Sequence, residues 1–327
     1  MDKQIKRIGV LTSGGDAPGM NAAIRSVVRT AINLGIECVG IRRGYNGLIA
    51  GDIVKLNSGS VTHILNRGGT ILYTARSMEF MTDAGQQKAV DMCRLLGLDG
   101  VIGIGGDGTF RGLMELSKRG ISVAGVPATI DNDISCTEYT LGFDTASNTA
   151  VDAIDRLRDT MQSHERCSVV EVMGRNAGHL ALYVGLAVGA TAVLVPERKI
   201  DFEKDVVDRI RQARLNGKTH YMIVVAEGAA SAMEIGQKIK DALALDPRVT
   251  ILGHIQRGGT PSARDRVMAT RMGYHAVETL AAGKTNRVIC SHHGAMVDMD
   301  IAEGLAMKKG LNVQQMAALE AMTGDSE

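Results

Sequence analysis

The chain has 327 residues, too many for a single ordinary hydrophobic core, so we expect two lobes. Apolar residues make up 45% of the sequence and charged residues 22%, as in most globular enzymes. A formal net charge of +1 and an aromatic content of 3% argue against nonspecific attraction to nucleic acid or anionic membrane, and against base-stacking surfaces.

Short β-branched runs alternate with helical stretches along most of the sequence. Buried strands separated by helices predict an α/β fold whose sheets are mainly parallel and covered on both faces. Such sheets bind ligands at the carboxyl ends of their strands, so the chemistry is expected in loops that follow strands. The predicted strands are Ile8–Leu11, Glu37–Ile41, Gly100–Ile104, Ser122–Val126, Ser168–Val172, Ala192–Val195, Met222–Ala226 and Val249–Leu252. The predicted helices include Ala22–Leu34, Ala89–Leu96, Phe110–Lys118, Ala146–Met161 and Glu203–Leu215.

Two features of the sequence indicate a cytoplasmic protein. The N-terminal residues lack the apolar stretch of a signal peptide, and no apolar run approaches the ~20 residues that cross a membrane. The cysteines are scattered and form no C-x-x-C pair, which favours reduced thiols over a zinc site or a disulfide scaffold. The five cysteines are Cys38, Cys93, Cys136, Cys167 and Cys290.

Two glycine-rich loops follow predicted strands and precede predicted helices. The first runs from Thr12 to Asn21 and includes Gly14, Gly15 and Gly19. Glycines let the backbone approach an anion, and the start of a helix offers unpaired N–H groups and a positive dipole end. Both features indicate a phosphate site, although many such turns are glycine-rich for steric reasons alone.

The second loop, Gly103 to Thr109, satisfies the dinucleotide fingerprint G-x-G-x-x-G. That fingerprint expects a carboxylate at the end of the next strand, where Val126-Pro127-Ala128 stands instead. Asp107 lies inside the glycine cluster, and magnesium is usually held by one or two carboxylates together with phosphate oxygens. The loop therefore predicts metal-linked phosphate rather than a dinucleotide.

An acid pair follows the next predicted strand, in the stretch from Thr129 to Asp133. In extended backbone, residues two apart point the same way, so Asp131 and Asp133 can face one small volume. A phosphoryl transferase needs one carboxylate to take a proton from the attacking hydroxyl and another to help fix the metal. A simple Asx turn is the structural alternative.

Arginines near predicted strand ends form the last pattern. A guanidinium can bond two phosphate oxygens at once, so their recurrence at strand ends suits phosphate monoesters better than chance surface ion pairs do. The four arginines are Arg166, Arg175, Arg248 and Arg257.

Together these stretches resemble bacterial ATP-dependent 6-phosphofructokinase. IGVLTSGGDAPGMNAAIR, GGDGT, TIDNDI, DRLRDT, SVVEVMGR and LGHIQRGG occur here in that family's order and spacing, from about residue 5 to 300. The resemblance implies two Rossmann-like three-layer lobes with mainly parallel sheets, a cleft between them that holds the active site, and a homotetramer. It also implies Mg²⁺-dependent transfer of the γ-phosphoryl of ATP to the 1-hydroxyl of fructose 6-phosphate, a step of glycolysis. The lobes expected are 1–142 plus 256–306 for ATP and 143–255 plus 307–327 for fructose 6-phosphate.

The resemblance also implies residue roles. Asp131 matches the general base, with Thr129, Arg76 and Arg175 steadying the transferred group. Magnesium matches Asp107 and Asp133. The ATP contacts are expected at Gly15, Tyr45, Arg76, Ser77, Gly106, Asp107, Gly108 and Thr109. The sugar-phosphate contacts are expected at Thr129, Ile130, Asp131, Met173, Gly174, Arg175, Glu227, His254 and Arg257, with Arg166 and Arg248 reaching in from a neighbouring subunit.

Two departures bear on donor choice and regulation. Gly108 is the residue found in ATP-using relatives. Ala128 stands where those enzymes usually have glycine, but alanine is small and uncharged, so ATP is still favoured over pyrophosphate. The family's effector site, which binds ADP or phosphoenolpyruvate, is matched by Arg25, Arg29, Arg158, Gly189, Lys218 and His220. However, Ser58, Asn216 and Thr191 replace its usual arginine, lysine and magnesium-binding glutamate, so we expect weak or altered regulation.

Three rival functions remain. The NAD and diacylglycerol kinases share GGDGT but lack the TIDND, MGR and HIQRGG sets. The second rival is a pyrophosphate-dependent phosphofructokinase, which an assay comparing both donors would distinguish. A catalytically silent sugar-phosphate-binding subunit would have lost the base or the metal carboxylate, and Asp131 and Asp107 are both present.

Overall fold

The computed structural model describes residues 5–323. The chain divides into two compact units, each built from separated stretches of sequence. The first unit contains the chain up to Ile130, Ile134–Thr145 and Arg257–Lys309, and the second contains Asp131–Asp133, Ala146–Gln256 and the chain from Gly310 onward.

The first unit is organised around a seven-stranded sheet of order β11-β10-β5-β4-β1-β2-β3. Its central strands are parallel, and the edge strands β3 and β11 run antiparallel to their neighbours. All six residues of β4 are buried, as expected for a parallel strand covered on both faces. The strands are β1 (Arg7–Thr12), β2 (Glu37–Ile41), β3 (Ile53–Leu56), β4 (Gly100–Gly105), β5 (Ser122–Pro127), β10 (Arg287–His292) and β11 (Ala295–Asp300).

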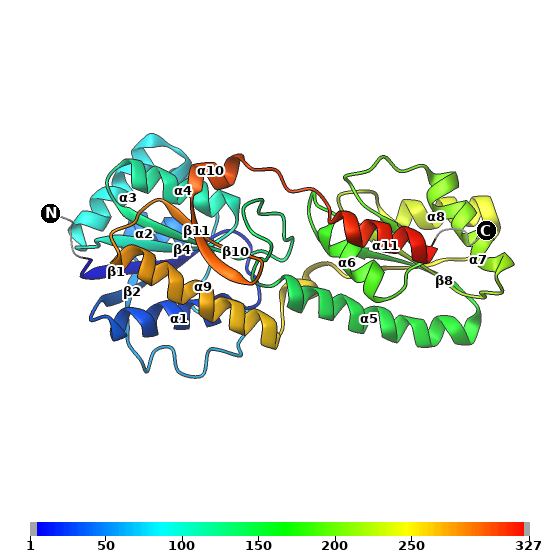
Figure 1. Ribbon diagram of the computed structural model, residues 1–327, viewed down its shortest axis with the longest axis horizontal. Helices are drawn as coiled ribbons and strands as arrows, with labels where there is room; N and C mark the ends of the chain where they lie inside the picture. The colour runs from blue at the N-terminus through cyan, green and yellow to red at the C-terminus, as the bar shows by residue number, and fades with distance from the viewer. Residues whose placement is uncertain (1–4, 324–327) are drawn as a thin grey trace. The chain divides into compact units, whose positions relative to one another are not determined.

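Helices cover both faces of this sheet (Figure 1). The helices α1 (Met20–Asn33) and α9 (Ala263–Ala281) pack together on one face. The other face buries an apolar cluster that includes Phe110 and Leu113. The helices over that face are α2 (Gly44–Ala50), α3 (Asp83–Leu95), α4 (Asp107–Lys118) and α10 (Ile301–Ala306).

Two of these helices begin where a hydroxyl caps the first turn. The Thr82 Oγ1 accepts the Gly85 N–H at 3.1 Å at the start of α3, and the Ser262 Oγ accepts the Asp265 N–H at 3.2 Å at the start of α9. Such caps satisfy an N–H group that has no partner inside the helix, so they fix where each helix starts.

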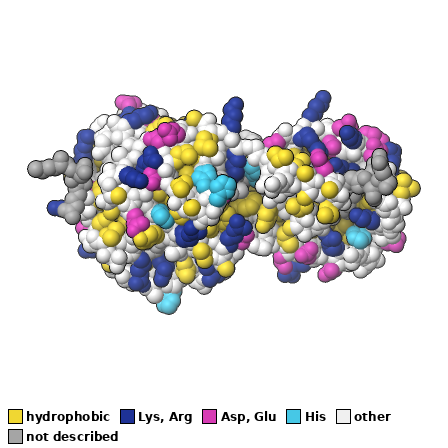
Figure 2. Space-filling model, viewed as in Figure 1, with side chains coloured by type: hydrophobic (Ala, Val, Ile, Leu, Met, Phe, Trp, Pro, Cys, Tyr) yellow, Lys and Arg dark blue, Asp and Glu magenta, His cyan; other side chains and the backbone are white. Residues whose placement is uncertain are grey.

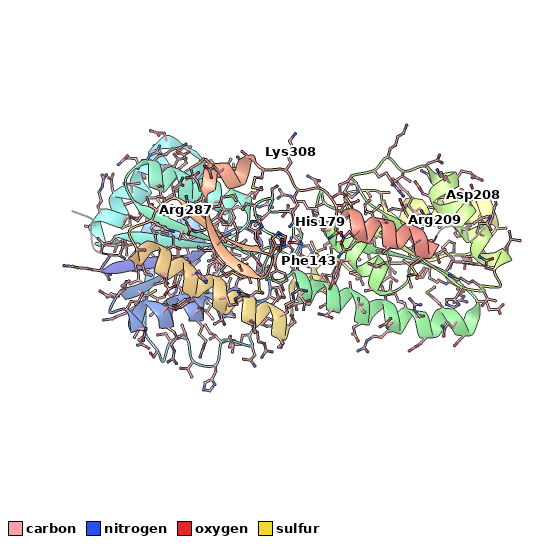
Figure 3. All side chains as sticks on the ribbon, viewed as in Figure 1. Phe143, His179, Asp208, Arg209, Arg287 and Lys308 are labelled. Carbon is pink, nitrogen blue, oxygen red and sulfur yellow. The ribbon has the colours of Figure 1, made fainter. Side chains whose placement is uncertain are left out.

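The second unit has a four-stranded parallel sheet of order β7-β8-β6-β9. Its core strand β8 is buried throughout. The strands are β6 (Cys167–Val172), β7 (Ala192–Leu194), β8 (Tyr221–Ala226) and β9 (Arg248–Ile251). The helices are α6 (His179–Ala187), α7 (Arg209–Leu215), α8 (Ala232–Leu243) and α11 (Val313–Thr323), while α5 (Phe143–His164) begins in the first unit, at the Phe143 labelled in Figure 3, and continues into the second.

The predicted α/β class with mainly parallel sheets is confirmed, and every predicted strand lies within one residue of an observed one. Four helices were predicted to start too late. The observed helices α1, α3, α4 and α5 begin at Met20, Asp83, Asp107 and Phe143, whereas the predicted starts were Ala22, Ala89, Phe110 and Ala146. The stretch predicted as one helix from Glu203 is π-helical to Asp208 and becomes α7 only at Arg209. Within residues 5–323, every helix is too short or too polar to traverse a bilayer.

Candidate active site

The two glycine-rich loops lie side by side in the first unit. They follow β1 and β4, which are neighbours in the sheet. The Ser13 N–H donates to the Ile104 carbonyl at 3.1 Å, and the Thr109 hydroxyl donates to the Ser13 carbonyl at 3.1 Å. Gly105 is required by this close approach, because a Cβ there would lie 2.3 Å from the Thr109 Oγ1.

The segment that carries Arg76 and Ser77 is fastened to the first loop. The Thr12 hydroxyl donates to the Tyr73 carbonyl at 2.8 Å, and the Thr74 hydroxyl donates to the Gly14 carbonyl at 2.7 Å. The Asn46 side-chain amide donates to the Arg76 carbonyl at 3.1 Å. The structure thus brings three predicted ATP-binding segments together around the carboxyl ends of β1 and β4.

Tyr45 packs against the start of α4 and stabilises the arrangement of these loops. Its side chain is buried, its ring stacks on Phe80 with centroids 4.1 Å apart, and its hydroxyl donates to the Thr109 carbonyl at 2.5 Å. A Cβ at Gly112 would lie 2.5 Å from the same ring, so a larger residue in that turn of α4 would displace it. The predicted ATP contact therefore also holds the first turn of α4 in place.

The first turn of α4 is suited to an anion. The helix begins at Asp107, and its N-cap residue Gly106 has no side chain that could cap the first turn. N–H groups at the start of a helix and the positive end of its dipole both favour bound phosphate. A Cβ at Gly108 would have no described neighbour within 4 Å, so the space above this turn is open.

The third loop follows β5, the next strand of the sheet. The Ala128 N–H donates to the Gly105 carbonyl at 3.0 Å, so the chain enters the acid-pair loop beside the second glycine-rich loop. The Thr129 carbonyl accepts a hydrogen bond from the Thr140 hydroxyl at 2.6 Å. Asp131 is 5% exposed, and Asn132 after it adopts a left-handed backbone with φ 50°.

The carboxylates available for magnesium fit a metal that arrives with nucleotide. Among the described residues, no group of three or more His, Cys, Asp or Glu side chains is arranged to hold a metal ion. Magnesium commonly takes only one or two protein carboxylates and completes its octahedron with phosphate oxygens and water. Asp107 in the first unit and Asp133 in the second are each a carboxylate of the type that magnesium takes.

In the second unit, the loops after β6, β8 and β9 meet. The Glu227 Oε1 accepts the N–H groups of Gly174 at 3.2 Å and Arg175 at 2.7 Å. The Met173 N–H donates to the Gln256 Oε1 at 2.9 Å. Three of the predicted sugar-binding segments are therefore joined at the carboxyl ends of adjacent strands.

Arg175 adopts a left-handed backbone with φ 57°, which turns the loop sharply after Gly174. The turn after β8 fits against it so closely that a Cβ at Gly228 would lie 2.1 Å from the Arg175 carbonyl oxygen. Gln256 belongs to the LGHIQRGG stretch, but no role was predicted for it, because its buried side chain bonds a residue 83 positions away.

Arg166 and Arg248 lie at the other end of the same strands. Arg166 precedes β6 and Arg248 opens β9, whereas Met173 and His254 follow these strands. A six-residue strand is about 20 Å long, so these two arginines are not gathered with the loops of their own unit. Their role in the sugar site of a neighbouring subunit therefore stays a prediction.

Arg257 is brought to the first loop. Its Nη1 donates to the Asp16 carbonyl at 3.3 Å, and a Cβ at Gly15 would lie 2.5 Å from the same nitrogen. Glycine at position 15 therefore leaves the space that this guanidinium occupies, which links a predicted sugar-phosphate contact to a predicted ATP-binding loop within one unit.

The predicted effector residues fall into separate groups. Arg25 and Arg29 line a pocket of about 270 Å³ between α1 and α9, together with Arg271 and His275. In Figure 2, Lys and Arg side chains gather over the part of the first unit where α1 and α9 lie. In the second unit, Arg158 donates to the Val188 carbonyl beside Gly189, and Lys218 and His220 precede β8.

Thr191, which stands where the family has a metal-binding glutamate, is engaged with the backbone. Its Oγ1 accepts the Met222 N–H at 3.2 Å, and its own N–H donates to the Met222 carbonyl at 2.7 Å. A neutral hydroxyl used in this way is a poor magnesium ligand.

Parallel α/β units with glycine-rich turns at adjacent strand ends define a class: proteins that hold phosphorylated ligands on backbone N–H groups and helix starts. Comparison with known proteins narrows the class. The chain belongs to the phosphofructokinase family, whose model, described as "Phosphofructokinase", matches residues 7–280.

Similar proteins and solved structures support the same family assignment. The chain is 52% identical over 308 residues to an ATP-dependent 6-phosphofructokinase of Clostridium botulinum, covering 94% of this chain and 96% of the relative. It is 54% identical over 309 residues to that of Bacillus cytotoxicus, covering 94% and 97%. The phosphofructokinase structure from Saccharomyces cerevisiae superimposes with a TM-score of 0.86 at 34% identity, covering 97% of this chain and 46% of the yeast chain. A pyrophosphate-dependent phosphofructokinase from Marinobacter aquaeolei gives 0.86 at 20% identity over 99% of this chain and 93% of that one, a likeness in fold alone.

Proposed function

We propose that this protein is an ATP-dependent 6-phosphofructokinase, which transfers the γ-phosphoryl group of ATP to the 1-hydroxyl of fructose 6-phosphate. The observation that carries the proposal is the gathering of the Thr12, Arg76 and Gly105 segments around the first turn of α4. The names of relatives that match this chain over nearly its full length support the same conclusion.

In the proposed mechanism, Asp131 accepts the proton of the sugar 1-hydroxyl as that oxygen attacks the γ-phosphorus, and the bond between the γ-phosphorus and the bridging oxygen breaks to release ADP. Arg76, Arg175 and Thr129 orient the phosphoryl group and stabilise the charge that develops on its oxygens. Magnesium bound with ATP would neutralise phosphate charge, and Asp107 and Asp133 would hold it. Burial of Asp131 keeps bulk water away from the base.

ATP is the favoured donor because of two small residues. Open space over Gly108 leaves room for the part of the nucleotide beyond the transferred phosphates. Ala128 is 1% exposed and adds no charge next to the loop, where a lysine would favour pyrophosphate. Pyrophosphate dependence and a silent sugar-phosphate-binding subunit are the two alternatives that the assay below excludes or supports.

The proposed assembly is a cytoplasmic homotetramer in which Arg166 and Arg248 complete the sugar site of a neighbouring subunit. Their position at the amino ends of β6 and β9 supports this assignment. The proposed lobes remain 1–142 plus 256–306 for ATP and 143–255 plus 307–327 for the sugar phosphate.

A steady-state assay tests the proposal. Fructose 6-phosphate is offered with either ATP or pyrophosphate, with Mg²⁺ present, and fructose 1,6-bisphosphate is measured. We expect turnover with ATP and little with pyrophosphate. Turnover with pyrophosphate alone would support the first alternative, and no turnover with either donor would support the second.

The same assay tests the base and the regulation. Replacing Asp131 by Ser should lower kcat by ~10²–10⁴ or more and leave substrate binding largely intact, because the proton acceptor is lost. Adding ADP or phosphoenolpyruvate should shift the sugar saturation curve little, since a lost cationic contact to phosphate removes about 1.5–3 kcal/mol. A strong response to micromolar phosphoenolpyruvate would contradict the expected weak regulation.

A further inference from the structure

Asp265 is a buried carboxylate that plays no part in the mechanism above. It lies in the first turn of α9 and is 0% exposed. Its Oδ1 accepts hydrogen bonds from the Tyr139 hydroxyl at 2.6 Å and the Gly142 N–H at 2.8 Å. Its Oδ2 accepts hydrogen bonds from the Thr145 N–H at 2.9 Å and the Thr145 hydroxyl at 2.5 Å. An ionised carboxylate has about four acceptor positions, so these donors fill them.

The hydrogen-bond donors around Asp265 favour the ionised form of this buried carboxylate. Burial raises the pKa of Asp265, and the hydrogen bonds from Thr145, Tyr139 and Gly142 oppose that rise. Each of these bonds is donated to Asp265, so the ionised form fits the site. Two charged groups lie next to the residues that bond Asp265: the Arg264 guanidinium is 4.8 Å from the Tyr139 ring centroid, and the Asp144 carboxylate is 3.9 Å from Arg264. A buried charge with this many donors fixes geometry strongly, because losing any one donor leaves a lone pair unsatisfied.

The segment that Asp265 holds also supports the strand end that leads to the acid pair. Thr140 lies inside this segment, and its hydroxyl donates to the Thr129 carbonyl at 2.6 Å. The next residue, Leu141, donates its N–H to the Pro127 carbonyl at 3.0 Å and forms a β-bridge with Ala128. Each residue from 127 to 129 is therefore held by a residue between Tyr139 and Thr145.

We propose that Asp265 is a positioning residue for phosphoryl transfer. It anchors Tyr139–Thr145, and the hydrogen bond from the Thr140 hydroxyl then fixes the Thr129 carbonyl and, two residues later, the position of Asp131. This inference rests on the proposed function. Proximity effects are steep, and a misplacement of about 1 Å can cost ~10²-fold in rate. We expect the anchor to affect kcat more than ATP binding, because the hydrogen bond from the Thr140 hydroxyl ends at Thr129, two residues before the proposed base.

The test compares a matched set of threonine variants. Thr140→Val removes the hydroxyl that reaches the Thr129 carbonyl, and Thr140→Ser keeps it. Thr285→Val is the control, because the Thr285 Oγ1 accepts the Val123 N–H at 3.0 Å at the opposite end of the same strand. The amount of competent protein is counted by calorimetric titration with MgATP, and kcat is expressed per ATP-binding site.

We expect Thr140→Val to lower kcat about tenfold, Thr140→Ser to restore most of it, and the KM for ATP to change by less than about threefold. Thr285→Val should lose a similar amount of thermal stability and keep its kcat. Asp265→Asn should lower kcat further, by about tenfold to a hundredfold, in the fraction that folds. If Asp265→Asn fails to fold, the Thr140 pair still decides the question.

Two results would overturn the inference. One is a Thr140→Val enzyme whose kcat per ATP-binding site stays within about twofold of wild type. The other is an equal loss in Thr285→Val, which would show that the effect is general destabilisation. A wild-type protein that forms no fructose 1,6-bisphosphate would instead overturn the proposed function, and the inference with it.

Discussion

At the scale of single residues, the absence of a side chain at position 108 has a specific chemical effect. Gly108 lies in the first turn of α4, with no described atom within 4 Å of the place a Cβ would take. Replacing it by Asp should favour folding, since an acid in the first turn suits the helix dipole. The new carboxylate would nevertheless repel phosphate. We expect the KM for ATP in steady-state kinetics to rise about tenfold or more, a cost of about 1.4 kcal/mol per tenfold.

Gly108→Ala is the matched control for that variant, because it adds a Cβ without charge. It should bind ATP nearly as well as the wild type. A Gly108→Asp enzyme with the same KM for ATP as Gly108→Ala would show that the phosphates do not pass over this turn.

At the scale of elements, one carboxylate of β11 pairs with two cations in and next to β10. The Asp298 carboxylate accepts hydrogen bonds from the Lys284 Nζ at 2.9 Å and the Arg287 Nε at 2.7 Å; Arg287 is labelled in Figure 3. The hydrogen bond from Lys284, followed by that from Arg287, lowers the pKa of Asp298 below its usual value.

A carboxylate with a lowered pKa stabilises the folded state above its unfolded pKa of about 3.9, and this contribution is lost as the pH falls through the native pKa. Asp298→Asn should therefore lower the free energy of unfolding by about 1 kcal/mol at pH 7. The difference from wild type should shrink as the pH falls below about 3.9. Urea denaturation at pH 7 and at a pH below about 3.9 measures this difference in the free energy of unfolding. Asp91→Asn, which breaks an exposed pair with Arg94, is the control and should cost almost nothing.

The sequence predicted the buried elements best. Strands such as β4 and β8 are continuous apolar runs, so their pattern alone predicted their position. The strands it missed, β3, β10 and β11, belong to the edges of the large sheet or lie next to one. In β3 and β11 half-exposed residues interrupt the apolar pattern.

The candidate site was predictable where its residues are contiguous, as in the glycine loops and the acid pair. The residues that support the site were not, because their partners are distant in sequence. Gln256 contacts Met173, and Asp265 contacts Tyr139, 126 positions away. Periodic patterns in a sequence relate only nearby residues, so a single sequence does not predict these long-range hydrogen bonds.

At the scale of the whole molecule, all five cysteines are buried. Burial raises the pKa of Cys38, Cys93 and Cys167 to about 12, so these thiols are neutral at physiological pH. Because the thiolate is the reactive form, these three thiols should react very slowly with a disulfide reagent in the native protein at pH 8. Five thiols should be titrated once the protein is unfolded in guanidinium chloride. Rapid labelling of Cys38, Cys93 or Cys167 in the native protein would contradict this.

The interleaved course of the chain has a consequence for biosynthesis. The helix α9 and the strands β10 and β11 complete the first unit, yet they are translated only after residues 146–256 of the second. Until then, the nascent sheet keeps β5 as an open edge and exposes the apolar face that α9 later covers. On the ribosome, we therefore expect the four-stranded sheet to form while the first-made strands still await their last partners, a period in which chaperones would have an apolar surface to bind.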